Sequence, residues 1–112
     1  MPIHAYRVQF TDAARRDQKG LRQYIVKQFG YSGYGKNFDN KMKSAVKAIK
    51  SAAVAIRPTS LYYREYNIYM FVHKTYLFFY IVDEPTRMIT VIRVMQDGMD
   101  WMSRLKRWTK QN

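Results

Sequence analysis

The chain has 112 residues, enough for about one domain, and its 20 Lys and Arg residues against 8 Asp and Glu give it a net charge of +12. It has no cysteine, which excludes a disulfide framework and a thiolate metal site, and no stretch approaches the roughly 18 apolar residues of a membrane span. We therefore expect one domain over residues 1–112 that attracts polyanions such as nucleic acid or an acidic protein.

The first residues and the histidine count bear on location and cofactors. Met1-Pro2-Ile3-His4 has neither the basic start nor the apolar run of a signal peptide, so we expect a cytoplasmic protein without membrane contact. His4 and His73 are the two histidines of the chain, too few for a protein metal site when no cysteine is present. We expect no metal and no cofactor.

The N-terminal half predicts a strand followed by two basic helices. Residues 3–10, "IHAYRVQF", are typical of a strand, and Thr11 is a suitable N-cap for a helix that begins at Asp12. Apolar side chains at helical spacing follow at Ala14, Leu21, Ile25 and Phe29. After a turn-rich passage at residues 30–35, apolar side chains recur at steps of four and three and predict a second helix. They are Phe38, Met42, Ala45, Ile49, Ala52 and Ile56, and Pro58 ends the pattern.

All of the net charge lies on three segments. Residues 13–27 carry +4, residues 36–57 carry +5 and residues 100–112 carry +3, while the remainder sums to zero. On the second predicted helix we select Lys43, Lys47 and Lys50 as candidate binding residues. Such rows of lysine are also common on the solvated faces of helices, but here few acids accompany them, so an acidic ligand would relieve their repulsion.

From Leu61 to Met95 the composition is rich in Tyr, Phe, Val and Ile and predicts strands. The segments are "LYYREY", "NIYMFVHK", "TYLFFYIVDE" and "MITVIRVMQ". The breaks at Asn67, residues 73–75 and residues 83–86 are too short for parallel crossovers, so successive strands are expected to be antiparallel neighbours. Trp101, Leu105 and Trp108 then form the apolar stripe of a short C-terminal helix.

The predicted fold is α+β, in the order β-α-α-β-β-β(-β)-α. An antiparallel sheet of four to five strands carries the N-terminal two-helix hairpin on one face, and the short C-terminal helix follows the last strand. Because one hairpin cannot cover both faces of such a sheet, we expect the opposite face to stay partly open and to carry the functional surface.

Two stretches carry a resemblance to a known family. "YRVQFTDAARRDQKGLRQYI" is similar to the opening strand and first helix of the RelE/ParE superfamily, the toxins of bacterial type II toxin-antitoxin systems. The end of that fold is resembled by "VHKTYLFFYIVDEPTRMITVIRVMQDGMDWMSRL". This stretch has two strands, a short polar loop at residues 96–99, here called the knuckle, and a helix that starts at Asp-Trp. The matching residues are Tyr76, Tyr80, Ile89, Val91, Arg93, Val94, Asp100 and Trp101. The resemblance implies a toxin that arrests growth and that a cognate acidic antitoxin neutralises in a hetero-oligomer.

Members of this superfamily act on one of two targets, ribosome-associated mRNA or DNA gyrase. Cleavage of mRNA needs a proton acceptor and cations that stabilise the developing charge. The candidate catalytic residues are His73, Lys74, Tyr76 and Arg93, and Arg64, Gln96 and Trp101 are further candidate binding residues. By strand alternation we expect Arg93 on the same face as Val91, and Gln96 on the opposite face.

The knuckle at residues 96–99 reads Gln-Asp-Gly-Met, where ribonuclease relatives carry Arg or Lys, and Leu77 stands where they carry Arg. These departures weaken the mRNA alternative. Inhibition of gyrase needs no group of catalytic residues. The gyrase-inhibiting relatives also commonly carry an arginine where this sequence has Met99. Two other hypotheses stay open: a non-catalytic nucleic-acid-binding module whose basic helices hold phosphates, and a toxin relative without activity.

Overall fold

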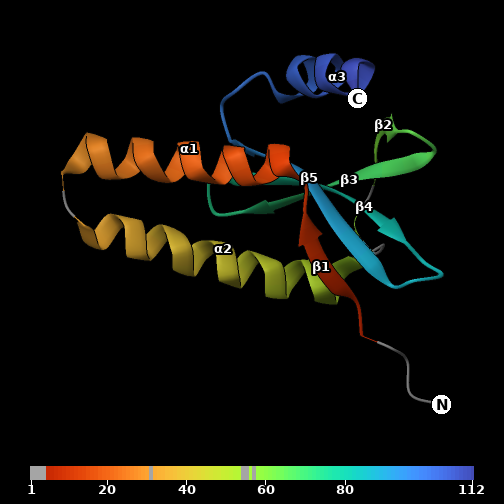
Figure 1. Cartoon of the computed structure of the whole chain (residues 1–112), viewed down its shortest axis with the longest axis horizontal. Coiled ribbons are helices and arrows are strands. Elements are labelled where there is room, and N and C mark those ends of the chain that lie inside the picture. Colours follow the sequence, from red (N-terminus) through yellow and green to blue (C-terminus); the bar gives the residue numbers. More distant parts are fainter. Residues whose placement is uncertain (1–4, 31, 54–55, 57) are drawn as a thin grey trace.

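The computed structural model describes residues 5–30, 32–53, 56 and 58–112, which contain five strands and three helices (Figure 1). The first elements are β1 (Arg7–Phe10), α1 (Asp12–Phe29) and α2 (Ser32–Ala52). They are followed by β2 (Pro58–Tyr63), β3 (Tyr66–His73), β4 (Tyr76–Asp83), β5 (Met88–Gln96) and α3 (Trp101–Gln111). The predicted α+β class and element order are confirmed. Across the described ranges, every helix is too short or too polar to cross a membrane.

The described strands form a five-stranded sheet in the order β1-β5-β4-β3-β2. From β2 to β5, neighbours in sequence pair antiparallel, as predicted. β1 instead pairs parallel to β5, with Arg7 opposite Met88 and Phe10 opposite Val91, so the sheet is mixed. The argument from short breaks does not extend to β1, because two helices separate it from the other strands.

Two connections in the sheet are two-residue turns. Arg64-Glu65 joins β2 to β3 and Lys74-Thr75 joins β3 to β4, with φ angles of 57° at Arg64 and 60° at Lys74. A positive φ at the first turn position is typical of tight hairpins. The break predicted at Asn67 is therefore wrong, because Asn67 lies inside β3 and the turn precedes it. The other two predicted breaks agree with the observed turns to within a residue.

The helix hairpin packs on one face of the sheet, as predicted. Thr11 caps α1, and its hydroxyl oxygen accepts a hydrogen bond from the Ala14 N–H at 3.1 Å. Both helices bury their apolar stripes against alternate residues of β4 and β5. The buried members include Phe38, Met42, Ala45, Ile49, Phe78, Tyr80, Val91 and Val94. The Tyr80 hydroxyl donates a hydrogen bond of 2.6 Å to the Ala53 carbonyl oxygen, which fastens the end of α2 to the sheet.

α2 begins earlier than the sequence predicts. The sequence predicts a loop at residues 32–35, but these residues form the first turn of α2. Gly30, with a φ of 62°, ends α1. Gly35 is buried where the two helices approach: a β-carbon there would lie 3.0 Å from Val26 Cγ2 and 2.9 Å from Arg22 Nη2. The glycine is thus used for close packing of helices, and its sequence pattern does not distinguish that use from a turn.

Parts of two predicted elements lie outside the described residues. They are residues 3–4 of the first predicted strand, including His4, and residues 54–55 of the second predicted helix. Within the described part, α2 ends at Ala52 rather than at the predicted Ile56.

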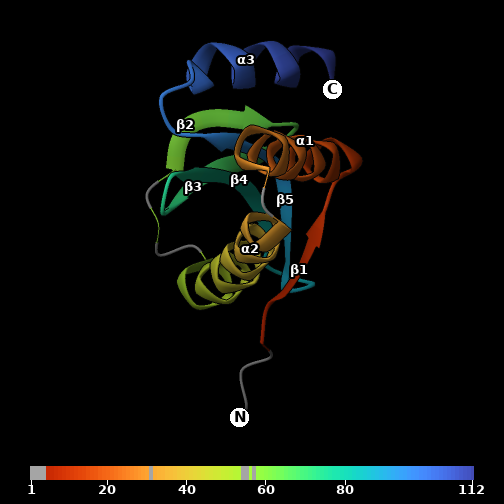
Figure 2. The same cartoon turned by 90° about the vertical axis from the view of Figure 1, so that its left-hand side faces the viewer.

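The opposite face of the sheet is covered at one end by α3, which Figure 2 shows across the sheet from α2. Leu105 is fully buried in a second core with Phe79 and Ile92. The face is thus only partly open, as predicted, and α3 closes this end of it because the apolar stripe of the helix needs a surface to cover it. Elsewhere on this face lies a hollow of about 370 Å³, lined in part by Gln9 and Thr90, whose side chains share a hydrogen bond of 2.9 Å.

Replacing Leu105 with alanine tests whether α3 is part of the fold. We expect Leu105→Ala to lower the free energy of unfolding by about 2 to 5 kcal/mol, because it removes buried contacts and leaves a cavity. Urea denaturation followed by circular dichroism measures the change. Met102→Ala, at a position 41% exposed on the same helix, is the control and should change the free energy by less than about 0.5 kcal/mol. Equal, small effects would contradict the packing of α3 on the sheet.

Candidate functional site

A β-bulge decides where Arg93 points. Phe79 pairs with Arg93 while the next residue, Tyr80, pairs with Val91, so Ile92 is an extra residue in β5. Side chains alternate strictly between faces only in a regular strand, and the extra residue shifts the alternation beyond it by one position. Arg93 therefore lies on the α3 side of the sheet, and the prediction that it shares a face with Val91 is wrong.

Arg93 forms a two-point ion pair with Asp17 of α1. Its Nε and Nη2 donate to the two carboxylate oxygens at 2.7 and 3.0 Å, and the side chains of Arg93 and Asp17 are only 21% and 17% exposed. The same carboxylate accepts the Val94 backbone N–H at 2.9 Å. Three donors thus converge on one acid, which neutralises Arg93 and holds α1 against β5.

Asp17 completes a row of contacts along the edge of β5. β1 pairs with β5 only as far as Val91, and beyond that point α1 lies alongside the strand. Thr11 donates its backbone N–H to the Val91 carbonyl at 3.0 Å and its hydroxyl to the Ile92 carbonyl at 2.8 Å. Together with the Val94 N–H that Asp17 binds, these edge groups find partners in α1 and its cap instead of in a strand.

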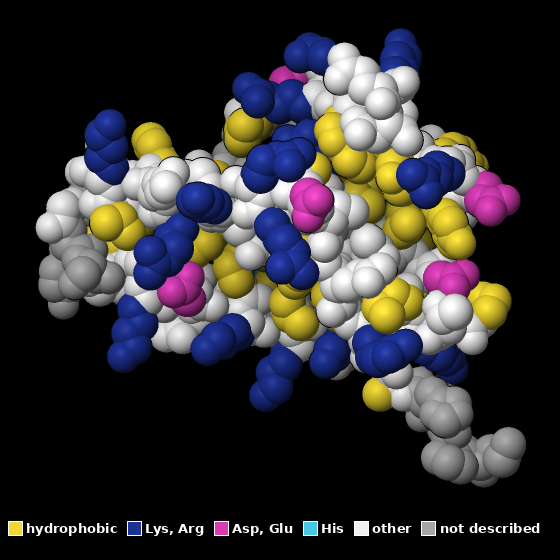
Figure 3. Space-filling model, viewed as in Figure 1, with side chains coloured by type: hydrophobic (Ala, Val, Ile, Leu, Met, Phe, Trp, Pro, Cys, Tyr) yellow, Lys and Arg dark blue, Asp and Glu magenta, His cyan; other side chains and the backbone are white. Residues whose placement is uncertain are grey.

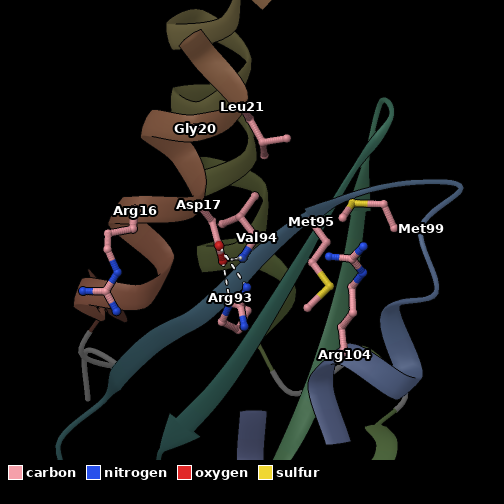
Figure 4. Close-up of a pocket in the computed structure, with 9 residues that line it drawn as sticks. All are labelled: Arg16, Asp17, Gly20, Leu21, Arg93, Val94, Met95, Met99 and Arg104. Atoms are coloured by element: carbon pink, nitrogen blue, oxygen red, sulfur yellow. Dashed lines mark hydrogen bonds and ion pairs between the residues drawn. The ribbon is translucent and has the colours of Figure 1, made fainter. Parts of the chain in front are cut away.

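Beside this ion pair, between α1 and α3, lies a hollow of about 260 Å³ (Figure 4). A second hollow of about 200 Å³ shares Arg93 and Arg104 with it and extends along α3. We call the two hollows together the arginine cleft. Its charged residues are Arg16, Asp17, Arg93, Arg104 and Arg107, and its apolar part is formed by Leu21, Met95 and Met99.

The arginine cleft has an excess of positive charge. Its one acid, Asp17, is engaged by Arg93, whereas Arg16, Arg104 and Arg107 form no ion pair within the described part of the chain. The wider surface has the same sign: Figure 3 shows Lys and Arg side chains gathered over the helices, with few Asp and Glu among them. An anionic group that enters the cleft therefore meets cations without a competing acid.

Trp108 closes the cleft on the α3 side. Its ring stacks on Tyr63 of β2 at a centroid distance of 5.1 Å, and the Arg93 guanidinium lies 5.9 Å from the ring centre. Trp101, a predicted binding residue, packs instead against Phe79 at 5.3 Å between ring centroids, in the core beneath α3. Both tryptophans hold α3 on the sheet.

The structure does not bring the four predicted catalytic residues together. His73 ends β3 and stacks on Phe71, on the hairpin side of the sheet, and Lys74 is exposed in the following turn. Tyr76 is 2% exposed and meets Phe38 edge-on at 5.4 Å, and burial raises the pKa of its hydroxyl. Arg93 lies on the other side of the sheet.

The remaining predicted binding residues are also dispersed. Arg64 lies in the β2–β3 turn over the Tyr63 ring, at 5.0 Å. Gln96 pairs with Tyr76 and so lies on the hairpin side, opposite Arg93 as predicted. Lys43, Lys47 and Lys50 are exposed on α2.

Of the predicted site residues, Arg93 is the one that lines the arginine cleft, and sequence reasoning missed the others. Asp17 carries a weak signal, as the single acid among five bases in residues 13–27. Arg104 and Arg107 stand three apart on the C-terminal helix, a spacing that places them on neighbouring positions of one face. Nothing in the sequence indicates that this face meets α1.

A comparison of two double-mutant cycles tests how much the Arg93–Asp17 pair contributes to the free energy of unfolding. We expect Asp17→Asn and Arg93→Gln to show a coupling energy of about 1 to 3 kcal/mol in the free energy of unfolding, because the pair is mostly buried and bidentate. The pair of Arg22 and Asp39, about half exposed at 47% and 48%, is the matched control. Its coupling should stay below about 1 kcal/mol, since solvent screens exposed charges. Equal couplings would refute a special role for Asp17.

Comparison with known proteins agrees with the fold. Residues 8–101 match the model of the family described as "ParE toxin of type II toxin-antitoxin system, parDE". A solved chromosomal ParDE system from P. aeruginosa superposes with a TM-score of 0.66 and 16% identity, covering 86% of this chain and 100% of that chain. For the RelBE2 toxin-antitoxin complex of Mycobacterium tuberculosis the TM-score is 0.58 and the identity 18%, with 83% and 99% covered. No curated protein matches the sequence. The match over most of its length shows that the chain belongs to the ParE toxin family of type II toxin-antitoxin systems.

Proposed function

We propose that the protein arrests bacterial growth by binding DNA gyrase, and that a cognate acidic antitoxin neutralises it in a hetero-oligomeric complex in the cytoplasm. Membership of the ParE family supports a toxin. One structural neighbour is a ParDE toxin-antitoxin system and the other is the RelBE2 toxin-antitoxin complex, which supports an antitoxin as partner. The net charge of +12 favours association with an acidic protein.

The separation of Arg93 from His73 and Tyr76, which pair with each other across β3 and β4, favours gyrase over mRNA as the target. Cleavage of mRNA needs a proton acceptor within hydrogen-bond reach of a ribose hydroxyl, with cations at the same phosphate. His73 and Arg93 lie on opposite sides of the sheet, and Arg93 is bound by Asp17. Tyr76 is buried and its pKa is raised by that burial, so its hydroxyl stays protonated at neutral pH and is no base. Binding to gyrase needs no such convergence.

Induction of the protein alone in bacteria tests the target. We expect incorporation of thymidine into DNA to fall before incorporation of amino acids into protein, with induction of the DNA damage response. In vitro, the purified protein should inhibit supercoiling of relaxed plasmid by purified gyrase. A prior fall in protein synthesis with new mRNA ends would support mRNA cleavage instead. Normal growth would support an inactive relative or a simple nucleic-acid-binding module.

Two substitutions separate the targets further. We expect His73→Ala and Tyr76→Phe to arrest growth as well as the natural chain, because neither side chain has a role in binding gyrase under this proposal. Colony counts on inducing medium, with immunoblots to equalise protein levels, measure the effect. Loss of a general acid or base typically costs about 10² to 10⁴ in rate, so a ribonuclease would lose its toxicity. Such a loss in either stable variant would contradict gyrase as the target.

A further inference from the structure

We propose that the arginine cleft binds an acidic segment of the antitoxin, in which a carboxylate side chain lies next to an apolar one. This inference rests on the proposed function, because it takes an antitoxin as the partner, and it adds the place and the chemistry of contact. The carboxylate binds Arg104 and Arg107, and the neighbouring apolar side chain packs on Met95, Met99 and Leu21.

The charges of the cleft call for an anion from outside. Arg93 and the Val94 N–H use both oxygens of Asp17, the one acid among the residues that line the cleft. Arg104 and Arg107 are exposed and form no ion pair in the described part of the chain. A carboxylate between two arginine side chains gains charge-assisted hydrogen bonds at little cost, because these guanidinium groups have no partner to give up.

The apolar part of the cleft favours a peptide over a bare anion. Figure 4 shows the Arg104 side chain extending from α3 toward Met95 and Met99, so an acid bound by Arg104 places its neighbour against the two methionines. Met95 is 2% exposed and Met99 is half-buried, which gives the hollow an apolar floor. Methionine side chains adapt to the shape of a partner, and a hollow of about 260 Å³ has room for a side chain.

The same geometry disfavours a nucleic acid. Single strands bind by stacking bases on aromatic rings that stand free beside cations. Trp108 is the one aromatic side chain that lines the cleft, and its ring is occupied by Tyr63 and by the Arg93 guanidinium. An acidic peptide uses both the arginines and the apolar floor, whereas a phosphate backbone uses the arginines alone.

The test uses the toxin and the antitoxin that relieves its growth arrest on co-expression, with affinity measured by calorimetry at two salt concentrations. We expect Arg104→Glu and Arg107→Glu each to weaken binding roughly 10-fold, and the double variant more, because each reverses a charge at the contact. Lys106→Glu is the matched control: it makes the same change in net charge on the same helix, about 200° around the axis from Arg104. It should change the affinity less than about 3-fold, since its charge acts only from a distance.

The possible results separate this inference from the proposed function. If the natural toxin arrests growth and binds the antitoxin, but Arg104→Glu and Arg107→Glu weaken the complex no more than Lys106→Glu does, the inference alone is overturned. If no complex forms with the natural toxin, the proposed function fails and the inference with it. Urea denaturation confirms that each variant is folded. A parallel titration measures the affinity of the same variants for single-stranded RNA. If the arginine variants bind RNA more weakly but bind the antitoxin as well as the natural toxin does, the inference is also overturned.

Discussion

The carboxylate of Asp17 is the point on which the arrangement of helix, strand and cleft depends. β1 is four residues long and leaves the second half of β5 without a strand on that side. The backbone groups exposed there need partners, and a side chain that accepts both a backbone N–H and a guanidinium supplies them within one contact. Because Asp17 sits on α1, the position of the whole helix hairpin is set relative to β5.

The same contact determines the chemistry of the cleft. An arginine that is 21% exposed would carry a large desolvation cost without a counter-charge, and the two-point ion pair with Asp17 offsets that cost. The cations that stay available are therefore those of α3 and the outer side of α1, and they surround the pair without taking part in it. The lysines of α2 differ from them, since they are spread over a helix surface and act on a partner mainly at long range.

Local patterns in the sequence predicted most of the fold. The spacing of Phe38, Met42 and Ala45 predicts a helix face, and the short breaks after β3 and β4 predict antiparallel neighbours, because both signals act within a few residues. The features that sequence reasoning missed depend on contacts distant in the chain. The bulge at Ile92 is defined by the pairing of β5 with β4, and the close packing of Gly35 is defined by its contact with α1. The covering of the sheet by α3 depends on the contact of Leu105 with Phe79. The sequence marks Arg93 as a site residue, but its partner Asp17 lies 76 residues away.

The parallel pairing of the first strand with the last has a consequence for synthesis on the ribosome. β1 and α1 emerge before the other strands, yet the groups they bind, from Val91 to Val94, lie in the last strand of the sheet to be made. Bringing these distant segments together costs conformational entropy, and the contacts that offset this cost form only afterwards. The N-terminal elements therefore dock late. A nascent chain therefore cannot display the finished cleft until β5 and α3 have both left the ribosome, however early its first helices form.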